Sequence, residues 1–170
     1  THYPYVTLQN GAPLAAAPDV ETDAPAAPFT FLVVGDSGTG DAAQLAVRDR
    51  MLVTSARFIL HTGDMMAEDG GEPDADQNFF TPYGDLVRHL VLWPSVGEAD
   101  VAADGAAWRD VFATPANNLA GAPDYYSFDF GNAHVVVLDS NADTAPGSAQ
   151  YTFLDADLDA TTATWKIAVL

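Results

Sequence analysis

Three apolar stretches of the chain each end at a glycine that is followed by acidic residues. The stretches span residues 29–34, 58–62 and 91–96, and the acids that follow them are Asp36, Asp64 and the pair Glu98 and Asp100. Short apolar runs rich in β-branched and aromatic residues are typical of buried strands. If these strands are parallel, their carboxyl ends meet at one rim. Three carboxylates converging on one rim would meet the ligand requirement of a divalent metal ion.

The candidate metal ligands are Asp36, Asp64 and an acid of the third stretch, Glu98 or Asp100. They form an all-oxygen set, which suits Mg²⁺, Mn²⁺ or Ca²⁺ better than zinc or iron. The simpler interpretation is that these acids only close turns, because Gly-Asp is common where strands end. The sequence leaves both interpretations open.

The histidines add little to this set. His61 lies inside the second apolar stretch, where it is either a ligand or a packed residue. His89 is expected to lie on the surface of a helix. His134 is expected to lie within a strand and to have a structural role. Nothing around His2 indicates a function.

The elements that must position the acids follow from periodicity and capping. A helix is predicted over 41–53, with Asp41 as its N-cap, between the first two strands. Strand, helix and strand in this order form a right-handed βαβ unit, so the sheet is expected to be parallel. A second helix is predicted over 78–90, with Pro82 near its first turn, and a shorter one over 106–112.

The C-terminal part is predicted to begin with a β-hairpin. Residues 125–130 and 134–139 read as strands joined by the turn pair Gly131-Asn132. A helix over 148–160 and a last strand over 165–170 follow. The open edge of that strand is expected to allow self-association.

Residues 1–14 contain an Asn-Gly turn signal and are predicted to form a hairpin, the remnant of a preceding β-rich module. Residues 15–28 are rich in proline and alanine and are expected to be a linker. The main domain is predicted over 29–170. Because the chain opens at Thr1 and stops within a predicted strand, we expect a processed form or a fragment.

Composition narrows the classes of partner. The chain has 170 residues, 48% of them hydrophobic, and a net charge of −18. Such an acidic surface repels nucleic acids and anionic membranes, so neither is expected as a partner. A halophilic or marine source and an ordinary acidic secreted protein both fit this charge. The absence of cysteine excludes disulfides and thiolate chemistry.

Taken in order along the chain, five motifs resemble those of the calcineurin-like metallophosphoesterases, and among them the bacterial relatives of purple acid phosphatase. The motifs are VVGDSGTG, HTGDM, LWPSVGEAD, YYSFDFGNAHVVVLDS and PGSAQYTFLDADL. The resemblance covers residues 29–170. It implies an α/β fold, a β-sandwich flanked by helices, of which this chain would hold the N-terminal portion with its βαβ units. It also implies that the preceding β-rich module is fibronectin-like and that the protein is secreted or at the cell surface.

The same resemblance implies a hydrolase of phosphate esters that uses one or two divalent metal ions. The candidate metals are Mg, Mn, Ca, Zn and Fe. By position, Asp36 would bind the first metal and Asp64 would bridge both. Glu98 stands where the family has an asparagine ligand.

Two substitutions depart from the family pattern. Ala67 stands in place of the tyrosine that ligates iron in purple phosphatases, and Ala99 in place of the histidine that protonates the leaving group. The family's remaining metal histidines lie downstream of residues 165–170. We therefore expect weak or no phosphatase activity from this chain. The alternative is a catalytically degenerate pseudoenzyme that serves as a structural or assembly module.

Overall fold

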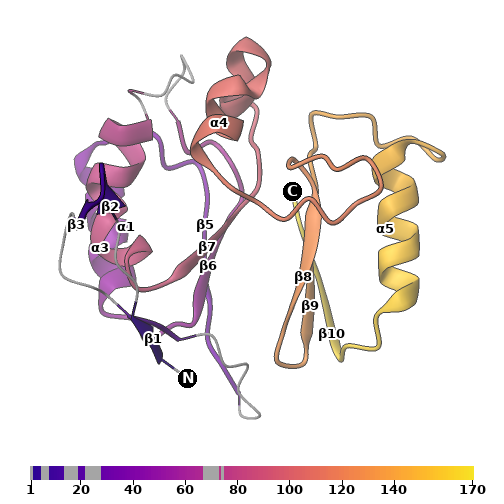
Figure 1. Cartoon of the computed structure of the whole chain (residues 1–170), viewed down its shortest axis with the longest axis horizontal. Coiled ribbons are helices and arrows are strands. Elements are labelled where there is room, and N and C mark those ends of the chain that lie inside the picture. Colours follow the sequence, from indigo (N-terminus) through magenta and orange to yellow (C-terminus); the bar gives the residue numbers. More distant parts are fainter. Residues whose placement is uncertain (1, 5–7, 14–18, 22–27, 67–72, 74) are drawn as a thin grey trace.

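In the computed structural model of the protein, the structure is described for all residues except 1, 5–7, 14–18, 22–27, 67–72 and 74. Two three-stranded sheets face each other at its centre (Figure 1). The first sheet is parallel, with the order β5 (Leu32–Val34), β6 (Phe58–His61), β7 (Val91–Pro94). The second has the order β10 (Trp165–Val169), β9 (Ala133–Val137), β8 (Tyr126–Phe130). The predicted α/β sandwich is confirmed.

Helices cover the outer faces of both sheets (Figure 1). On the first sheet lie α1 (Ala42–Leu52) and α3 (Thr81–Val87), and on the second α5 (Ala149–Ala160). A 3-10 helix (Ala99–Gly105) and α4 (Ala106–Val111) follow the third strand of the first sheet. Among the described residues, no helix is both long and apolar enough to span a membrane.

Local sequence signals account for most element boundaries. Asp41 caps α1 by accepting a hydrogen bond from Gln44 N, 2.9 Å away, and Ser148 caps α5 in the same way. β8 and β9 are antiparallel across Gly131, whose φ is +60°, while β9 and β10 are parallel. The predicted βαβ unit and the hairpin are therefore confirmed.

The helix predicted over 78–90 is wrong in its bounds. The structure has a π-helical turn (Ala75–Phe80) that leads into α3, and α3 ends at Val87. Pro82 lies in the first turn of α3. Because proline has no N–H to donate to an earlier carbonyl, a regular α-helical ladder cannot run through it unbroken.

The central strand β6 is buried on both faces, which explains its unbroken apolar sequence. Phe58 and Leu60 pack into the layer between the sheets, together with Tyr126 and with Val135 and Val137 of β9. Trp93 stacks on Phe128 in this layer, with ring centroids 3.9 Å apart. Ile59 points the other way, into a second core beneath α1, α3 and α4. The sandwich thus has two cores that share one strand.

Four short strands precede the main sheets. β2 (Leu8–Gln9) and β3 (Ala12–Pro13) pair across Asn10 and Gly11, both at positive φ, as the Asn-Gly signal predicts. β1 (His2–Pro4) pairs with β4 (Asp19–Glu21), which lies within the stretch expected to be a linker. The rest of that stretch up to residue 27 lies outside the described residues. Assignment of these strands to a preceding module remains a prediction.

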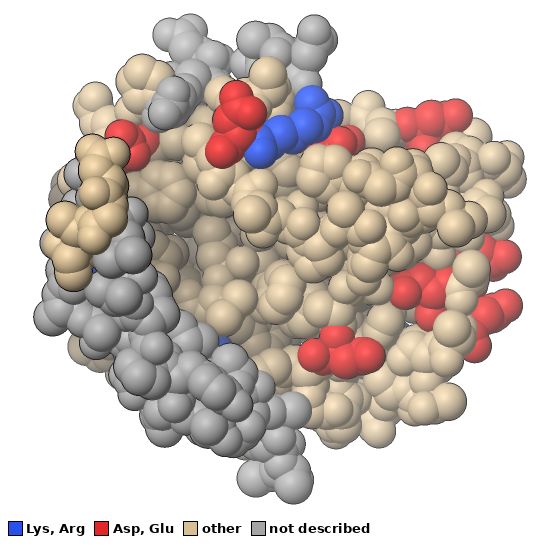
Figure 2. All heavy atoms as spheres, in the orientation of Figure 1, with Lys and Arg blue, Asp and Glu red and all other residues tan. Residues whose placement is uncertain are grey.

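Acidic side chains are spread over the face that Figure 2 shows, and basic ones are few. This distribution agrees with the net charge of −18.

Candidate functional site

Asp36 and Asp64 lie on adjoining loops, directly after β5 and β6. Asp36 N donates to Gly63 O (3.1 Å), and Ser37 N and Gly38 N both donate to Asp64 O (2.9 and 3.2 Å). Both aspartates adopt the left-handed conformation, with φ of +52° and +56°. Asp and Asn tolerate this region better than other non-glycine residues, but it still costs about 1–2 kcal/mol. The structure therefore holds two strained carboxylate-bearing turns side by side.

The third loop packs against the second through glycines. A Cβ added at Gly63 would lie 2.6 Å from the backbone N of Gly97, so only hydrogen fits between the two loops. Asp64 Oδ1 also accepts a hydrogen bond from Ala99 N (2.9 Å). Glu98 lies between these contacts but is exposed. The loop that carries Glu98 is thus fixed to Asp64 by its backbone.

Asp100 is the acid of the third loop that points inward, and it is fully buried. Its Oδ2 accepts hydrogen bonds from Asp64 N (2.8 Å) and Gly97 N (2.9 Å), and its Oδ1 from Met65 N and Met66 N (both 3.0 Å). Burial raises the pKa of Asp100, and these four donors limit the rise because they favour the anion. One carboxylate therefore ties the second loop to the third.

The ligand predicted from the sequence by resemblance on this loop was Glu98, and Asp100 was only its neighbouring acid. Both acids follow the same glycine, and nothing local in the sequence distinguishes the inward one.

The end of β9 adds polar groups beside the third loop. Asn141 Nδ2 donates to Asp139 Oδ1 (3.1 Å) and lies 3.5 Å from Val96 O. The buried Gln150 of α5 holds this strand end, because it accepts from Asp139 N (2.7 Å) and donates to Asp139 O (2.9 Å). The rim of strand-end loops, which carries Asp36, Asp64 and Asp100, therefore extends from the first sheet to Asp139 and Asn141 of the second.

Among the residues that the structure describes, no group of three or more Asp, Glu, His or Cys side chains is arranged to hold a metal ion. Asp36 and Asp64 lie on joined loops, but within the described part of the chain no third Asp, Glu, His or Cys completes a group with them, and the side chain of Ala99 offers no donor atom. The donors that the structure describes are therefore incomplete for a two-metal centre. The metal roles of Asp36, Asp64 and Glu98 stay predictions. Ala67 lies outside the described residues.

His61 is packed in the core and has no exposed surface. Its Nδ1 accepts a hydrogen bond from Gly63 N (3.2 Å), so the ring proton is on Nε2, which donates to Ser37 Oγ at 2.7 Å. Burial lowers the pKa of His61 to about 3. The imidazole is therefore neutral, and it cannot accept the proton of Ser37. A Ser-His nucleophile pair is excluded at this position.

His134 is buried under α5, away from the rim. Its Nε2 lies 2.6 Å from Asp157 Oδ2, and its Nδ1 lies 2.8 Å from Asp129 Oδ1. Burial lowers the pKa of His134, but hydrogen bonds and charge from Asp157 and Asp129 outweigh it and raise the pKa above 6.5. The structural role predicted for His134 is confirmed. His89 is exposed, as expected, but it lies in a turn after α3 and not on a helix.

No family model matches the chain, and no curated protein matches it by sequence. Among solved structures, the chain is similar to the purple acid phosphatase PPD1 isolated from yellow lupin (Lupinus luteus) seeds. The two share 18% sequence identity with a TM-score of 0.79, over 95% of this chain and 34% of that chain. The chain therefore has a metallophosphoesterase-type fold and spans about a third of the length of the structure it matches.

Proposed function

We propose that the rim of Asp36 and Asp64 is that of a metal-dependent, acid-phosphatase-like phosphoester hydrolase, and that these 170 residues hydrolyse phosphate esters weakly or not at all. One observation carries the proposal. Two aspartates, each forced into the left-handed conformation, end adjacent parallel strands in a fold that a purple acid phosphatase shares. Backbone strain of this kind is concentrated at functional sites.

The expected weakness follows from the side chains at the third loop. Ala99 cannot protonate a leaving group, and loss of a general acid costs a factor of about 10²–10⁴. Enzymes commonly turn over at about 10 s⁻¹. We therefore expect turnover of at most ~10⁻¹ s⁻¹.

The test measures binding and turnover separately. Metal-free protein is titrated with Mn²⁺ by calorimetry and then assayed with a nitrophenyl phosphate. We expect Asp36→Asn and Asp64→Asn each to weaken Mn²⁺ binding about tenfold or more, because each removes one charged ligand. Asparagine keeps the left-handed backbone, so both variants should fold. The control is Asp155→Asn, an exposed acid of α5.

A gain-of-function variant makes the experiment sharper. Ala99→His restores an imidazole at the position where the resemblance expects one, and should raise turnover. The matched control is Ala160→His, at the end of α5. Turnover well above ~10⁻¹ s⁻¹ in the unmodified chain, or Mn²⁺ binding equal in all variants, would refute the proposal.

The second candidate is an assembly module. Within the described residues β10 pairs only with β9, and Trp165 at its start is 63% exposed. An open edge with an exposed aromatic residue favours pairing with a second copy of the chain. Light scattering across a concentration series tests this: Trp165→Ala should reduce association, whereas Tyr151→Ala on α5 should not. A monomer at every concentration would rule the candidate out.

A further inference from the structure

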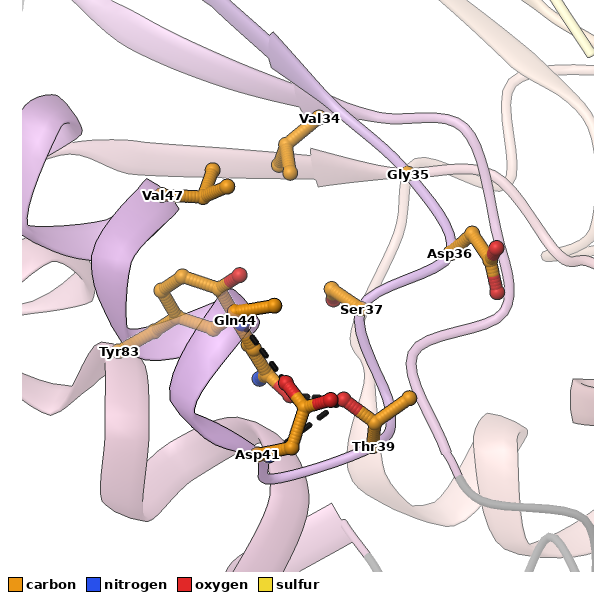
Figure 3. Close-up of a pocket in the computed structure, with 10 residues that line it drawn as sticks. Val34, Gly35, Asp36, Ser37, Thr39, Asp41, Gln44, Val47 and Tyr83 are labelled. Carbon is orange, nitrogen blue, oxygen red and sulfur yellow. Dashed lines mark hydrogen bonds between the residues drawn. The ribbon is translucent and has the colours of Figure 1, made fainter.

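A hollow of about 220 Å³ lies between the β5–α1 turn and α3 (Figure 3). Its volume exceeds that of cavities that admit a benzene-sized molecule, at about 150 Å³. Asp36 is among the residues around it, but its carboxylate points away from Tyr83 and Gln44 in Figure 3. The hollow is therefore beside the rim described above and not part of it.

Buried polar groups form one side of the hollow. Ser37, Gln44 and Tyr83 are only 4%, 5% and 2% exposed. The Tyr83 hydroxyl has no hydrogen-bond partner among the described residues. Burial raises the pKa of Tyr83, and the nearby Ser37 and Gln44 side chains and the charge of Arg48 offset only part of that rise. None of them reaches hydrogen-bonding geometry with the Tyr83 hydroxyl. A buried, neutral and unpartnered hydroxyl costs about 1–3 kcal/mol, which a ligand can recover.

The other polar groups are already engaged. Gln44 Oε1 accepts from Gly40 N (2.6 Å), and its Nε2 donates to Asn78 O (2.6 Å). Ser37 Oγ accepts a hydrogen bond from His61 Nε2. Tyr83 is thus the member of this set whose polar atom makes no hydrogen bond among the described residues.

Charge and shape select the kind of ligand. Val34, Val47 and Ala43 supply an apolar wall, and the Asp41 carboxylate is exposed at the mouth. The hydrogen bond from Gln44 N lowers the pKa of Asp41, so it is an anion. The lining includes no Lys, Arg or His, and Arg48, whose charge reaches Tyr83 from outside the lining, is paired with Asp49 at 2.7 Å. These features disfavour anions and favour a small cation with an aliphatic part.

We propose that this hollow binds a small primary ammonium compound, whose aliphatic part packs on Val34 and Val47 and whose N–H groups donate to Tyr83 and Asp41. This site does not depend on the proposed phosphoester hydrolase, because it uses neither a metal ion nor the carboxylates of Asp36 and Asp64.

The probe is isopropylammonium, compared with isopropanol and isobutyrate, which have similar shapes but are neutral and anionic. Titrations followed by amide NMR shifts are run in EDTA, so that a metal at the rim does not contribute. We expect saturable shifts at the hollow with isopropylammonium alone.

Tyr83→Phe should weaken binding about fivefold and Asp41→Asn about threefold. Phenylalanine removes an unsatisfied hydroxyl and asparagine still caps α1, so both variants should fold. Tyr151→Phe and Asp155→Asn, two changes on α5, serve as controls and should bind like the unmodified chain. Equal binding of the neutral or anionic probe, unchanged affinity in Tyr83→Phe, or no saturable shift would each overturn the proposal.

Discussion

The Asp100 carboxylate offers the sharpest test of how the rim is held together. It is fully buried, and its two oxygens accept four backbone hydrogen bonds from the second and third loops. Asp100→Asn keeps the size and shape of the side chain. The amide has one oxygen, so its NH₂ group must face two backbone N–H groups that now have no acceptor.

The cost can be worked out from these contacts. Hydrogen bonds to a charged acceptor contribute about 1.5–3 kcal/mol each, and the variant loses two of them. We therefore expect the free energy of unfolding to fall by ~3–6 kcal/mol. Domains are stable by only about 5–15 kcal/mol, so this loss is a large fraction of the total.

Urea unfolding followed by circular dichroism at pH 7 measures the change. For a slope near 2 kcal/mol per molar, the midpoint should fall by ~2 M with no change in slope. Asp110→Asn, on the exposed surface of α4, is the matched control and should shift stability by less than about 0.5 kcal/mol. A loss below about 1 kcal/mol in Asp100→Asn would refute the idea that this carboxylate holds the loops together.

Three further changes test other contacts by the same unfolding assay. Burial lowers the pKa of His134, but Asp157 and Asp129 raise it by more. The stability that these two ion pairs give the folded protein should therefore be complete below pH 6.5 and fall as the pH rises through the raised pKa of His134. His134→Gln should abolish that pH dependence. Asp36→Ala should cost about 1 kcal/mol more than Asp36→Asn, because alanine tolerates the left-handed backbone poorly; equal costs would contradict the strain argument. Gly97→Ala should cost about 1–3 kcal/mol or more, because its Cβ would collide with Asp64; a neutral result would mean that the loops separate easily.

Much of the fold could be predicted because its signals are local. Asp41 and Ser148 cap their helices through donors three residues away in the sequence, and Gly131 supplies the positive φ of its hairpin. The predicted helix over 78–90 had the wrong bounds, since its helical sequence pattern does not reveal the π-helical turn before Pro82. The candidate site was predictable in part: strand-end glycines placed Asp36 and Asp64 on adjoining loops.

The sequence by itself determined the order of the elements, the parallel first sheet, the acidic surface and the strand ends that carry the carboxylates. These features depend on periodicity and on residues close together in the chain. Only the tertiary structure decided that Asp100 points inward while Glu98 stays exposed, and that His61 is neutral. It also decided that the Tyr83 hydroxyl is buried with no hydrogen-bond partner among the described residues. Asp100 contacts N–H groups up to 36 residues away, and His61 reaches Ser37 across 24 residues. Contacts of that length form only when separate strands pack together, so no local pattern encodes them.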